Sequence, residues 1–304
     1  MSSVLVVGSV AYDTVETATD RQDDLLGGSA TYFGAAASFF APVQVVAVVG
    51  EDFHDEELNF LRQRQVDFSG LQRQAGKTFR WGGRYSADFL QRQTLYTHLN
   101  VFEQFKPEIP AALQQTRYVF LANIGPELQL DVLAQMQHPR FVAMDTMNYW
   151  INHTPKLVRQ VLARVDGLII NDEEARMLTG EANLICAMRQ ICRLGPRVLV
   201  VKKGEHGAIL LLNDDFFYLP AFPVENLVDP TGAGDTFAGG FMGYLAQADQ
   251  LDELIFRNAL VFASAVGSLC VEGFGLSRLQ TATKSEVFQR YRTFQKLTHF
   301  ELTE

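Results

Sequence analysis

The chain has 304 residues and a formal net charge of -9, an acidic balance that removes the overall attraction on which binders of nucleic acid and of anionic membranes rely. Hydrophobic residues make up 47% and charged residues 20% of the chain, which is ordinary globular usage and excludes a disordered or fibrous protein. Because there is no apolar run of 18 residues, no signal-peptide pattern and no linker or repeat, we expect one cytoplasmic domain over residues 1–304. Its partners should be small molecules, with no nucleic acid and no membrane.

The first predicted strand and a glycine pair indicate a site for hydroxyl groups. Residues 4–7 form a short apolar run typical of a buried strand, and Asp13 follows it closely. A carboxylate just beyond such a strand can accept hydrogen bonds from two hydroxyls of a polyol, although a loop aspartate facing water has the same pattern. Gly27 and Gly28 then precede small residues and a predicted helix, so the backbone can closely approach either a ligand or a neighbouring strand.

Residues 76–100 break the alternation of strands and helices. Segments 77–85 and 93–97 carry aromatic residues and glycines in patterns typical of strands rather than of a crossover helix. Together with a segment at about 14–24, they predict a small β-sheet that covers the site as a lid. Phe79, Trp81 and Tyr85 give this lid an apolar surface and the sheet an open edge, from which we expect a homodimer through the lid.

The second half of the chain returns to a regular alternation. Apolar strands are predicted at 118–121, 141–144, 168–170 and 198–201, with helices between them, after earlier strands at 4–7 and 43–49. This pattern predicts an α/β fold with a mostly parallel sheet and helices on both faces. Polar residues follow the later strands, namely Asn123, Asp145, Asn171 and Lys202. Since ligands of open α/β sheets bind outside the carboxyl ends of strands, we expect these side chains to face one crevice.

Two of these strand ends carry groups suited to a metal ion and to phosphate. Asn171 followed by an acidic first turn is the pattern of an N-cap that complements the helix dipole, but Glu174 could instead hold water around Mg²⁺. Lys202 stands beside Gly204 and Gly207, a combination that suits the phosphate tail of a nucleotide. A later helix at 251–271 carries small residues such as Ala263, which offer an apolar slot for a ligand or allow close helix packing.

The segment 226–241 is a polar, glycine-bearing loop that runs into a helix. Gly232, Ala233 and Gly234 stand where backbone N–H groups at a helix start lack partners, which is a place for an anion. Asp235 brings a negative charge to the same place. This is explained if Asp235 takes a proton from a group that attacks the anion, or if it only caps the helix.

Residues 229–237, with the sequence Asp-Pro-Thr-Gly-Ala-Gly-Asp-Thr-Phe, resemble the C-terminal signature of the ribokinase-like, or PfkB, family of carbohydrate and nucleoside kinases. The glycine pair, the lid, the Asn171 region and the Gly204 loop also fall in the order of that family, so the resemblance spans almost the whole chain. It implies a ribokinase-like fold and an ATP-dependent enzyme that transfers the γ-phosphoryl group to a hydroxymethyl group of a small carbohydrate.

The resemblance also implies roles for individual residues. Asp235 would be the general base, and the Gly232, Ala233 and Gly234 N–H groups would form the anion hole. Asp13, Gly27 and Gly28 would bind hydroxyls of the acceptor. The nucleotide side would comprise Asn171 and Glu174 with Mg²⁺, Lys202 on the phosphates, adenine between the Gly204–Gly207 loop and the segment that begins at Ala263, and Asp229 beside a monovalent cation such as K⁺.

The acceptor is less defined than the reaction. The glycine pair of the family usually continues to an asparagine that touches the acceptor, whereas this chain has Tyr32, Phe33 and Gly34 in that neighbourhood. Ala11 stands where ribokinases tend to carry asparagine, which is more similar to some nucleoside kinases. The sequence therefore predicts a sugar kinase, with an adenosine-like nucleoside kinase as the alternative. A non-catalytic regulator that binds a sugar or nucleotide is a third hypothesis.

Overall fold

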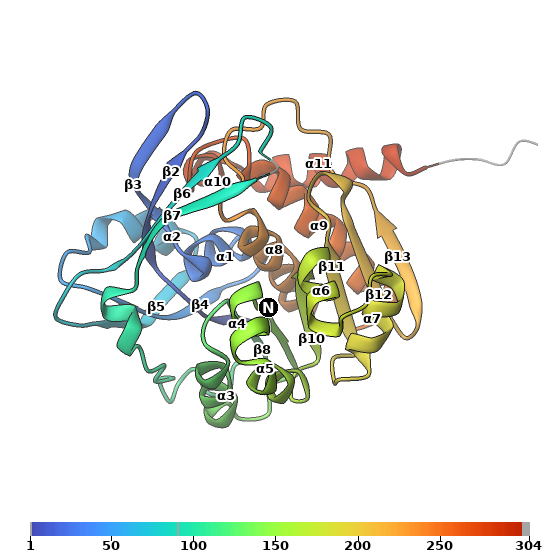
Figure 1. Cartoon of the computed structure of the whole chain (residues 1–304), viewed down its shortest axis with the longest axis horizontal. Helices are drawn as coiled ribbons and strands as arrows, with labels where there is room; N and C mark the ends of the chain where they lie inside the picture. The colour runs from blue at the N-terminus through green and yellow to red at the C-terminus, as the bar shows by residue number, and fades with distance from the viewer. Residues whose placement is uncertain (1, 90, 300–304) are drawn as a thin grey trace, which may run out of the picture.

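The structure is a computed structural model that describes residues 2–89 and 91–299. Its strands form one sheet of nine strands and one of four (Figure 1). The large sheet has the order β13 (Asp215–Leu219), β12 (Ala208–Leu212), β11 (Val198–Lys202), β10 (Gly167–Asn171), β9 (Phe141–Met144), β8 (Tyr118–Leu121), β1 (Val4–Val7), β4 (Val43–Val49) and β5 (Val66–Arg73). Its ladders are parallel except where β12 pairs with β11 and with β13.

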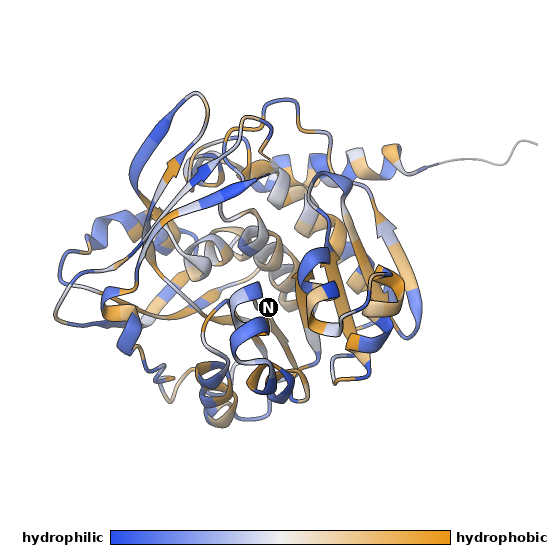
Figure 2. Cartoon of the chain, in the orientation of Figure 1, coloured by the Kyte–Doolittle hydropathy of each residue, from blue (hydrophilic) through white to orange (hydrophobic). Residues whose placement is uncertain are grey.

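Helices cover both faces of the large sheet. They are α1 (Ser29–Ala37), α2 (Asn59–Gln63), α3 (Pro126–Gln135), α4 (Asn148–His153), α5 (Pro155–Leu162), α6 (Asp172–Thr179), α7 (Leu184–Cys192), α8 (Ala233–Ala248), α9 (Glu253–Cys270), α10 (Ser277–Thr281) and α11 (Lys284–Leu297), with 3-10 turns η1 (Asp55–Leu58), η2 (Asn100–Gln104) and η3 (Gly204–His206). Val4 and Val6 join the core under α1, α8 and α9, whereas Leu5 and Val7 join the core under α3, α5 and α6. Alternate residues of a strand therefore serve two cores, which explains the continuous apolar runs in Figure 2.

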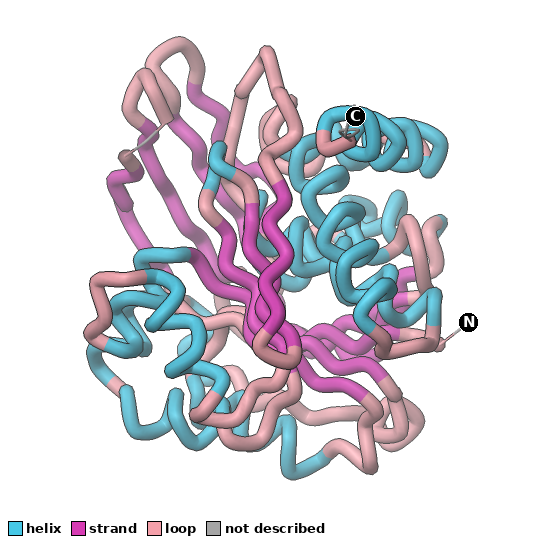
Figure 3. The backbone as a smooth tube through the Cα atoms, turned by 90° about the vertical axis from the view of Figure 1, so that its right-hand side faces the viewer, coloured by secondary structure: helices cyan, strands magenta, loops and turns pink. Residues whose placement is uncertain are grey.

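The small sheet has the order β3 (Arg21–Gly27), β2 (Ala11–Glu16), β6 (Phe79–Tyr85) and β7 (Arg92–His98). In Figure 3 its strands rise at an angle from the large sheet. The sheet forms from the two predicted regions, but its first strand begins at Ala11 and ends at Glu16. It ends there because the Thr17 N–H donates to the Asp20 carbonyl at 2.8 Å and closes a turn. The predicted α/β fold with a mostly parallel sheet, helices on both faces and a separate small sheet is confirmed.

β5 and α4 are among the elements that were not expected from the sequence. β5 alternates buried and exposed residues at the edge of the large sheet, so it lacks the apolar run that marks the inner strands. α4 ends at His153, and α5 begins at Pro155, whose ring nitrogen has no N–H to donate. Of the three cysteines, Cys270 is buried, Cys192 is partly buried and Cys186 is exposed.

α9 is long and apolar enough to cross a membrane by length and composition alone, with a mean hydropathy of 1.4 over 18 residues. However, 61% of that window is buried inside the fold, where α9 packs against α8 and α11. A core helix passes the same test, so the composition of α9 is weak evidence for a membrane span.

Candidate active site

The loop at 229–235 leads into α8. Gly232 is the N-cap of α8 and has a φ of 72°, a left-handed conformation that glycine adopts without strain. A Cβ at this position would overlap the aromatic ring of Tyr32, which packs against the loop. The N–H of Ala233 donates to the Pro230 carbonyl at 3.2 Å, so this predicted anion-hole donor closes a turn in the structure. Gly232 therefore fixes the start of the helix whose first turn carries Asp235.

Lys202 and Asp145 meet at the carboxyl ends of β11 and β9. Lys202 Nζ lies 3.7 Å from Asp145 Oδ2, and both side chains are mostly buried. A Cβ at Gly234 would lie 3.0 Å from the same Nζ, so the ammonium group stands directly beside the 229–235 loop. Burial alone would lower the pKa of Lys202, but the negative charges of Asp145, Glu174 and Asp235 raise it above its usual value. The expectation that these strand ends share one crevice is supported by this cluster.

Asp235 has the environment of a tunable base. Burial, reinforced by the negative charge of Asp145, raises the pKa of Asp235 to about 7. Lys202 and Arg92 oppose this rise because their positive charges favour the carboxylate. A carboxyl group with a pKa near neutrality can take a proton from a hydroxyl in the transition state and release it afterwards.

Asn171 and Glu174 form the cap that the sequence allowed. Asn171 Oδ1 accepts from the Glu174 N–H at 2.7 Å, and Glu174 Oε2 accepts from the Asn171 N–H at 2.9 Å, a reciprocal capping box at the start of α6. Burial and the charge of Asp145 raise the pKa of Glu174 to about 7, while Lys202 lowers it. The capping box therefore presents an acidic side chain beside Lys202.

These carboxylates suit a metal ion that arrives with a nucleotide. Within residues 2–89 and 91–299, no three His, Cys, Asp or Glu side chains gather closely enough to hold a metal ion. Mg²⁺ usually keeps several waters and binds phosphate oxygens together with one or two carboxylates. Glu174 and Asp145 fit that outer role, whereas a cage of protein ligands does not fit this site.

Asp13 follows β1 and lies inside β2 of the small sheet, so the alternative of a loop aspartate facing water is wrong. Its side chain is only 5% exposed, and a Cβ at Gly27 would overlap its carboxylate. Burial and the negative charges of Asp229 and Asp235 raise the pKa of Asp13 to about 7, against a hydrogen bond from Gly28 that lowers it. Asp13, Gly27 and Gly28 are thus brought together, and glycine at 27 is required by the close approach.

Replacing Asp13 by asparagine is expected to stabilise the fold above neutral pH. Because the pKa of Asp13 is raised from 3.8 to about 7, its contribution to stability is present below pH 3.8 and is lost as the pH rises through about 7. Asparagine has no such charge, so the gain in unfolding free energy of Asp13→Asn should grow across this window and stay constant above it. Urea unfolding at pH 5 and pH 8 measures this, and an equal gain at both values would contradict the burial argument.

Asp229 ties two loops together. It is completely buried, and its two oxygens accept from the Thr231 N–H at 2.8 Å and the Gly275 N–H at 3.0 Å. The 229–235 loop is thereby joined to the loop that follows α9. The role of Asp229 beside a monovalent cation stays a prediction.

Three of the residues predicted to border the nucleotide, Gly204, Gly207 and Ala263, have structural contacts of their own. Gly204 begins η3, and the Lys203 N–H donates to the Gly207 carbonyl at 2.8 Å, so the glycines close a short loop after β11. Ala263 has no exposed surface, and a Cβ at Gly240 would lie 2.9 Å from its Cα. The alternative of close helix packing is therefore supported for Ala263, and the place of adenine beside the segment that begins at Ala263 stays a prediction.

A contact between the lid and the 229–235 loop was not expected from the sequence. The Tyr85 hydroxyl of β6 lies 3.1 Å from Thr231 Oγ1, and Tyr85 is only 8% exposed. Tyr85 was expected on an outer apolar surface but faces the site. Arg92 of β7 pairs with Tyr85 in the ladder, and its charge lowers the pKa of Asp235. A period-two reading of 81, 83 and 85 would have placed these residues on one face.

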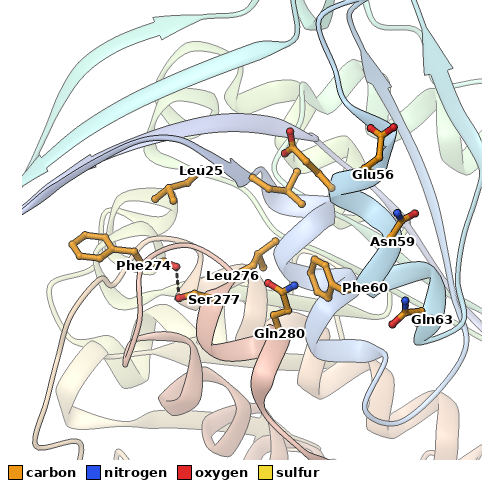
Figure 4. Close-up of a pocket in the computed structure, with 11 residues that line it drawn as sticks. Leu25, Glu56, Asn59, Phe60, Gln63, Phe274, Leu276, Ser277 and Gln280 are labelled. Carbon is orange, nitrogen blue, oxygen red and sulfur yellow. Dashed lines mark hydrogen bonds between the residues drawn. The ribbon is translucent and has the colours of Figure 1, made fainter.

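A surface pocket of about 500 Å³ lies outside this cluster (Figure 4). It is bounded by β3, the η1–α2 segment and α10, and both apolar and polar side chains line it, Leu25, Phe60, Phe274 and Glu57 among them. None of the predicted catalytic, acceptor or nucleotide residues lines this pocket. The candidate active site is therefore the cluster around Asp235 and Lys202.

Comparisons with known proteins show the family and the fold of the chain. A family model described as pfkB family carbohydrate kinase matches residues 1–282. A cytidine kinase of Thermococcus kodakarensis is 30% identical over 261 residues, which cover 84% of this chain and 92% of that protein. The structure of a Methanocaldococcus jannaschii nucleoside kinase has a TM-score of 0.77 at 20% identity and covers 96% of this chain and 99% of its own. The structure of an aminoimidazole riboside kinase from Salmonella enterica, complexed with aminoimidazole riboside and an ATP analog, has a TM-score of 0.74 at 19% identity. The match covers 95% of this chain and 100% of that chain.

Proposed function

Because the chain belongs to the pfkB family of carbohydrate kinases and is a phosphotransferase with an alcohol group as acceptor, we propose that it transfers the γ-phosphoryl group of ATP to a hydroxymethyl group of a small carbohydrate, free or within a nucleoside. The observation that carries this proposal is the convergence of Asp235, Lys202 and Asp145 beside the glycines at the start of α8. The negative charge of Asp235 also contributes to the raised pKa of Asp13 in the lid, which supports a meeting of the acceptor with the phosphoryl donor near Asp235.

The proposed transfer requires one general base and several hydrogen-bond donors to the phosphoryl oxygens. The hydroxyl oxygen of the acceptor forms a bond to the γ-phosphorus while the bond from that phosphorus to the bridging oxygen of ADP breaks. Asp235 accepts the hydroxyl proton. N–H groups of Gly232 and Gly234, together with Lys202, stabilise the charge on the phosphoryl oxygens, whereas Ala233 would first have to give up its turn to Pro230.

Bound Mg²⁺ would shield the charge of the nucleotide phosphates, with Glu174 and Asn171 orienting its waters. Asp229 would hold K⁺ beside the 229–235 loop, and Gly204 and Gly207 would border the nucleotide. Activity measured with EDTA should vanish, and activity measured in K⁺ should exceed that in Na⁺. Equal rates in both salts would remove the role of Asp229 as a cation ligand.

A nucleoside acceptor is favoured by one feature of the lid. Trp81 pairs with Asp13 in the β2–β6 ladder and is only partly buried, so an indole ring stands on the face that carries Asp13. Such a ring can stack on a nucleobase. The cytidine kinase relative supports the same choice. A free sugar is the second candidate, because Asp13 serves the hydroxyls of either acceptor.

Incubation with ATP and a panel of sugars and nucleosides tests the proposal, with mass spectrometry of the products. We expect one phosphoryl group to be added to a nucleoside or a sugar that carries a hydroxymethyl group. If nothing in the panel gains a phosphoryl group while the chain still binds a sugar or nucleotide, a non-catalytic regulator becomes the better account.

We also propose a cytoplasmic homodimer that pairs through the lid. The order of the small sheet leaves β3 and β7 as edge strands, whose backbone groups can pair with a second copy. Because Tyr85 is buried within the chain, it adds no apolar surface to the lid. The proposed dimer is therefore supported by the edge strands rather than by an apolar surface. Light scattering should give twice the chain mass of 34.0 kDa, and a monomeric mass at working concentration would contradict the dimer.

A further inference from the structure

The lid presents three large side chains on the face that carries Asp13. Residues paired across a ladder point to the same face of a sheet, and β2 pairs Asp13 with Trp81. Along β6 alternate residues share a face, which adds Tyr85. The β6–β7 ladder pairs Tyr85 with Arg92, so Arg92 joins the same face. Arg84 points the other way, where it forms an ion pair with Glu16 at 2.7 Å.

Tyr85 joins this face of the lid to the 229–235 loop. Its hydroxyl lies 3.1 Å from Thr231 Oγ1, a contact between residues 146 positions apart in the chain. Thr231 immediately precedes Gly232, and its N–H donates to Asp229. The lid residue opposite Tyr85 is therefore held above the start of α8.

Arg92 occupies that position. Its guanidinium carbon lies 5.5 Å from the centre of the Trp81 ring, and the side chain is exposed. Its positive charge lowers the pKa of both Tyr85 and Asp235, so it lies within electrostatic reach of the proposed base. Lys202 stands beside Gly234 of the same loop.

The balance of charges in the site favours a second positive side chain beside Lys202. Lys202 is surrounded by the carboxylates of Asp145, Glu174 and Asp235, which offset its positive charge. A transferring phosphoryl group brings further negative charge, spread over its equatorial oxygens. The guanidinium fork binds such oxygens with two parallel N–H groups and stays charged at any working pH.

We propose that Arg92 is a catalytic residue that binds the transferring phosphoryl group from the lid side, and that Tyr85 is a positioning residue that holds it there through Thr231. This inference rests on the proposed kinase function of the same site. Arg92 could instead bind a negative group of the acceptor. The contact of its ladder partner Tyr85 with Thr231, which immediately precedes the N-cap of α8, favours the phosphoryl group.

The test compares Arg92→Gln with the matched variant Arg84→Gln, which removes an arginine from the opposite face of the same lid. With the acceptor found in the panel, Arg92→Gln should lower kcat by about 10²-fold, as the loss of one charge-stabilising donor does. Arg84→Gln should leave kcat unchanged. Calorimetric titration should show that Arg92→Gln weakens the binding of ADP with aluminium fluoride, a mimic of the transferring group, more than the binding of ADP alone.

Tyr85→Phe removes only the hydroxyl that reaches Thr231, and it should lower kcat by roughly 10-fold without changing the affinity for ADP. Arg92→Lys keeps the charge and should recover part of the loss. An unchanged melting temperature verifies that each variant is folded.

Three results would overturn the inference. Arg92→Gln could behave like Arg84→Gln, or it could raise KM for the acceptor at unchanged kcat, which would assign Arg92 to an anionic acceptor. The affinity for ADP with aluminium fluoride could also remain that of the wild type. A wild type that phosphorylates no acceptor overturns the proposed function instead, and is distinct from an active wild type whose Arg92→Gln variant is equally active.

Discussion

Asp235→Asn is expected to lower kcat by about 10³-fold while the affinity for ATP stays close to that of the wild type. Asparagine has nearly the shape of aspartate but cannot take the hydroxyl proton. The side chain lies in the first turn of α8 beside Lys202, so the variant also removes one of the charges that raise the pKa of Lys202. Single-turnover phosphorylation, followed by quenching and mass analysis, measures the loss at the chemical step.

Asp214→Asn is the matched control, because Asp214 is an exposed aspartate in the β12–β13 turn with a φ of 66°, a conformation that asparagine tolerates. It should keep the wild-type rate. An Asp235→Asn variant that retained more than about a tenth of wild-type kcat would remove Asp235 from the role of general base, given the usual contribution of such a group.

The same assignment predicts the pH dependence of the reaction. The base must be ionised, and burial together with Asp145 raises the pKa of Asp235 to about 7. kcat/KM should therefore rise as the pH increases through about 7 and level off above it. Arg92 and Lys202 hold this pKa down, so Arg92→Gln should move the rise to higher pH. A flat profile from pH 5 to pH 9 would contradict an ionisable base in this site.

Gly232→Ala is expected to reduce kcat by about 10²- to 10³-fold, the size of effect seen when an oxyanion donor is displaced. Two independent reasons apply. Alanine is strained at the φ of 72°, and its Cβ would overlap the ring of Tyr32, which is almost completely buried and has little room to move. The N-terminal turn of α8 must then shift, and with it the donors that face the phosphoryl group.

Gly180→Ala is the control that separates the effect of backbone strain from the effect of displacing the 229–235 loop. Gly180 has a φ of 76° at the end of α6, but a Cβ there would meet nothing within 4 Å. This variant should lose about 1 kcal/mol of unfolding free energy and keep its activity. If Gly232→Ala were as active as Gly180→Ala, the position of the 229–235 loop would not matter for the reaction.

The large sheet could be predicted well because its strands are buried on both faces. Strands such as β1 and β8 are uninterrupted apolar runs, and their limits agree with the predictions. The edge strand β5 could not be found in this way, since one of its faces meets solvent and its residues alternate. Polar residues at strand ends were a reliable guide to the site: Asp145 and Lys202 do meet, at 3.7 Å.

The lid was harder to predict, because its contacts depend on the register between strands, which cannot be read from the sequence. The sequence left a water-facing loop open for Asp13, which belongs to β2, where Tyr12, Thr14 and Val15 favour a strand. Tyr85 and Arg92 come together only through the β6–β7 register, and Thr231 joins them from 146 positions away. The role of Ala263 could not be decided from the sequence, because small residues on a helix serve close packing as well as ligand binding. The burial of Ala263 where α9 meets α8 supports the packing.

The most direct test of the account is a crystal structure of the protein with ADP, Mg²⁺, aluminium fluoride and the acceptor identified in the panel. We predict that the fluoride group lies between Asp235 and the N–H groups at the start of α8, with Lys202 on one side and Arg92 on the other. The acceptor hydroxymethyl group should point at Asp235 and its other hydroxyls at Asp13. Nucleotide and acceptor bound away from the 229–235 loop, for example in the pocket beside β3 and α10, would contradict the assignment of the active site.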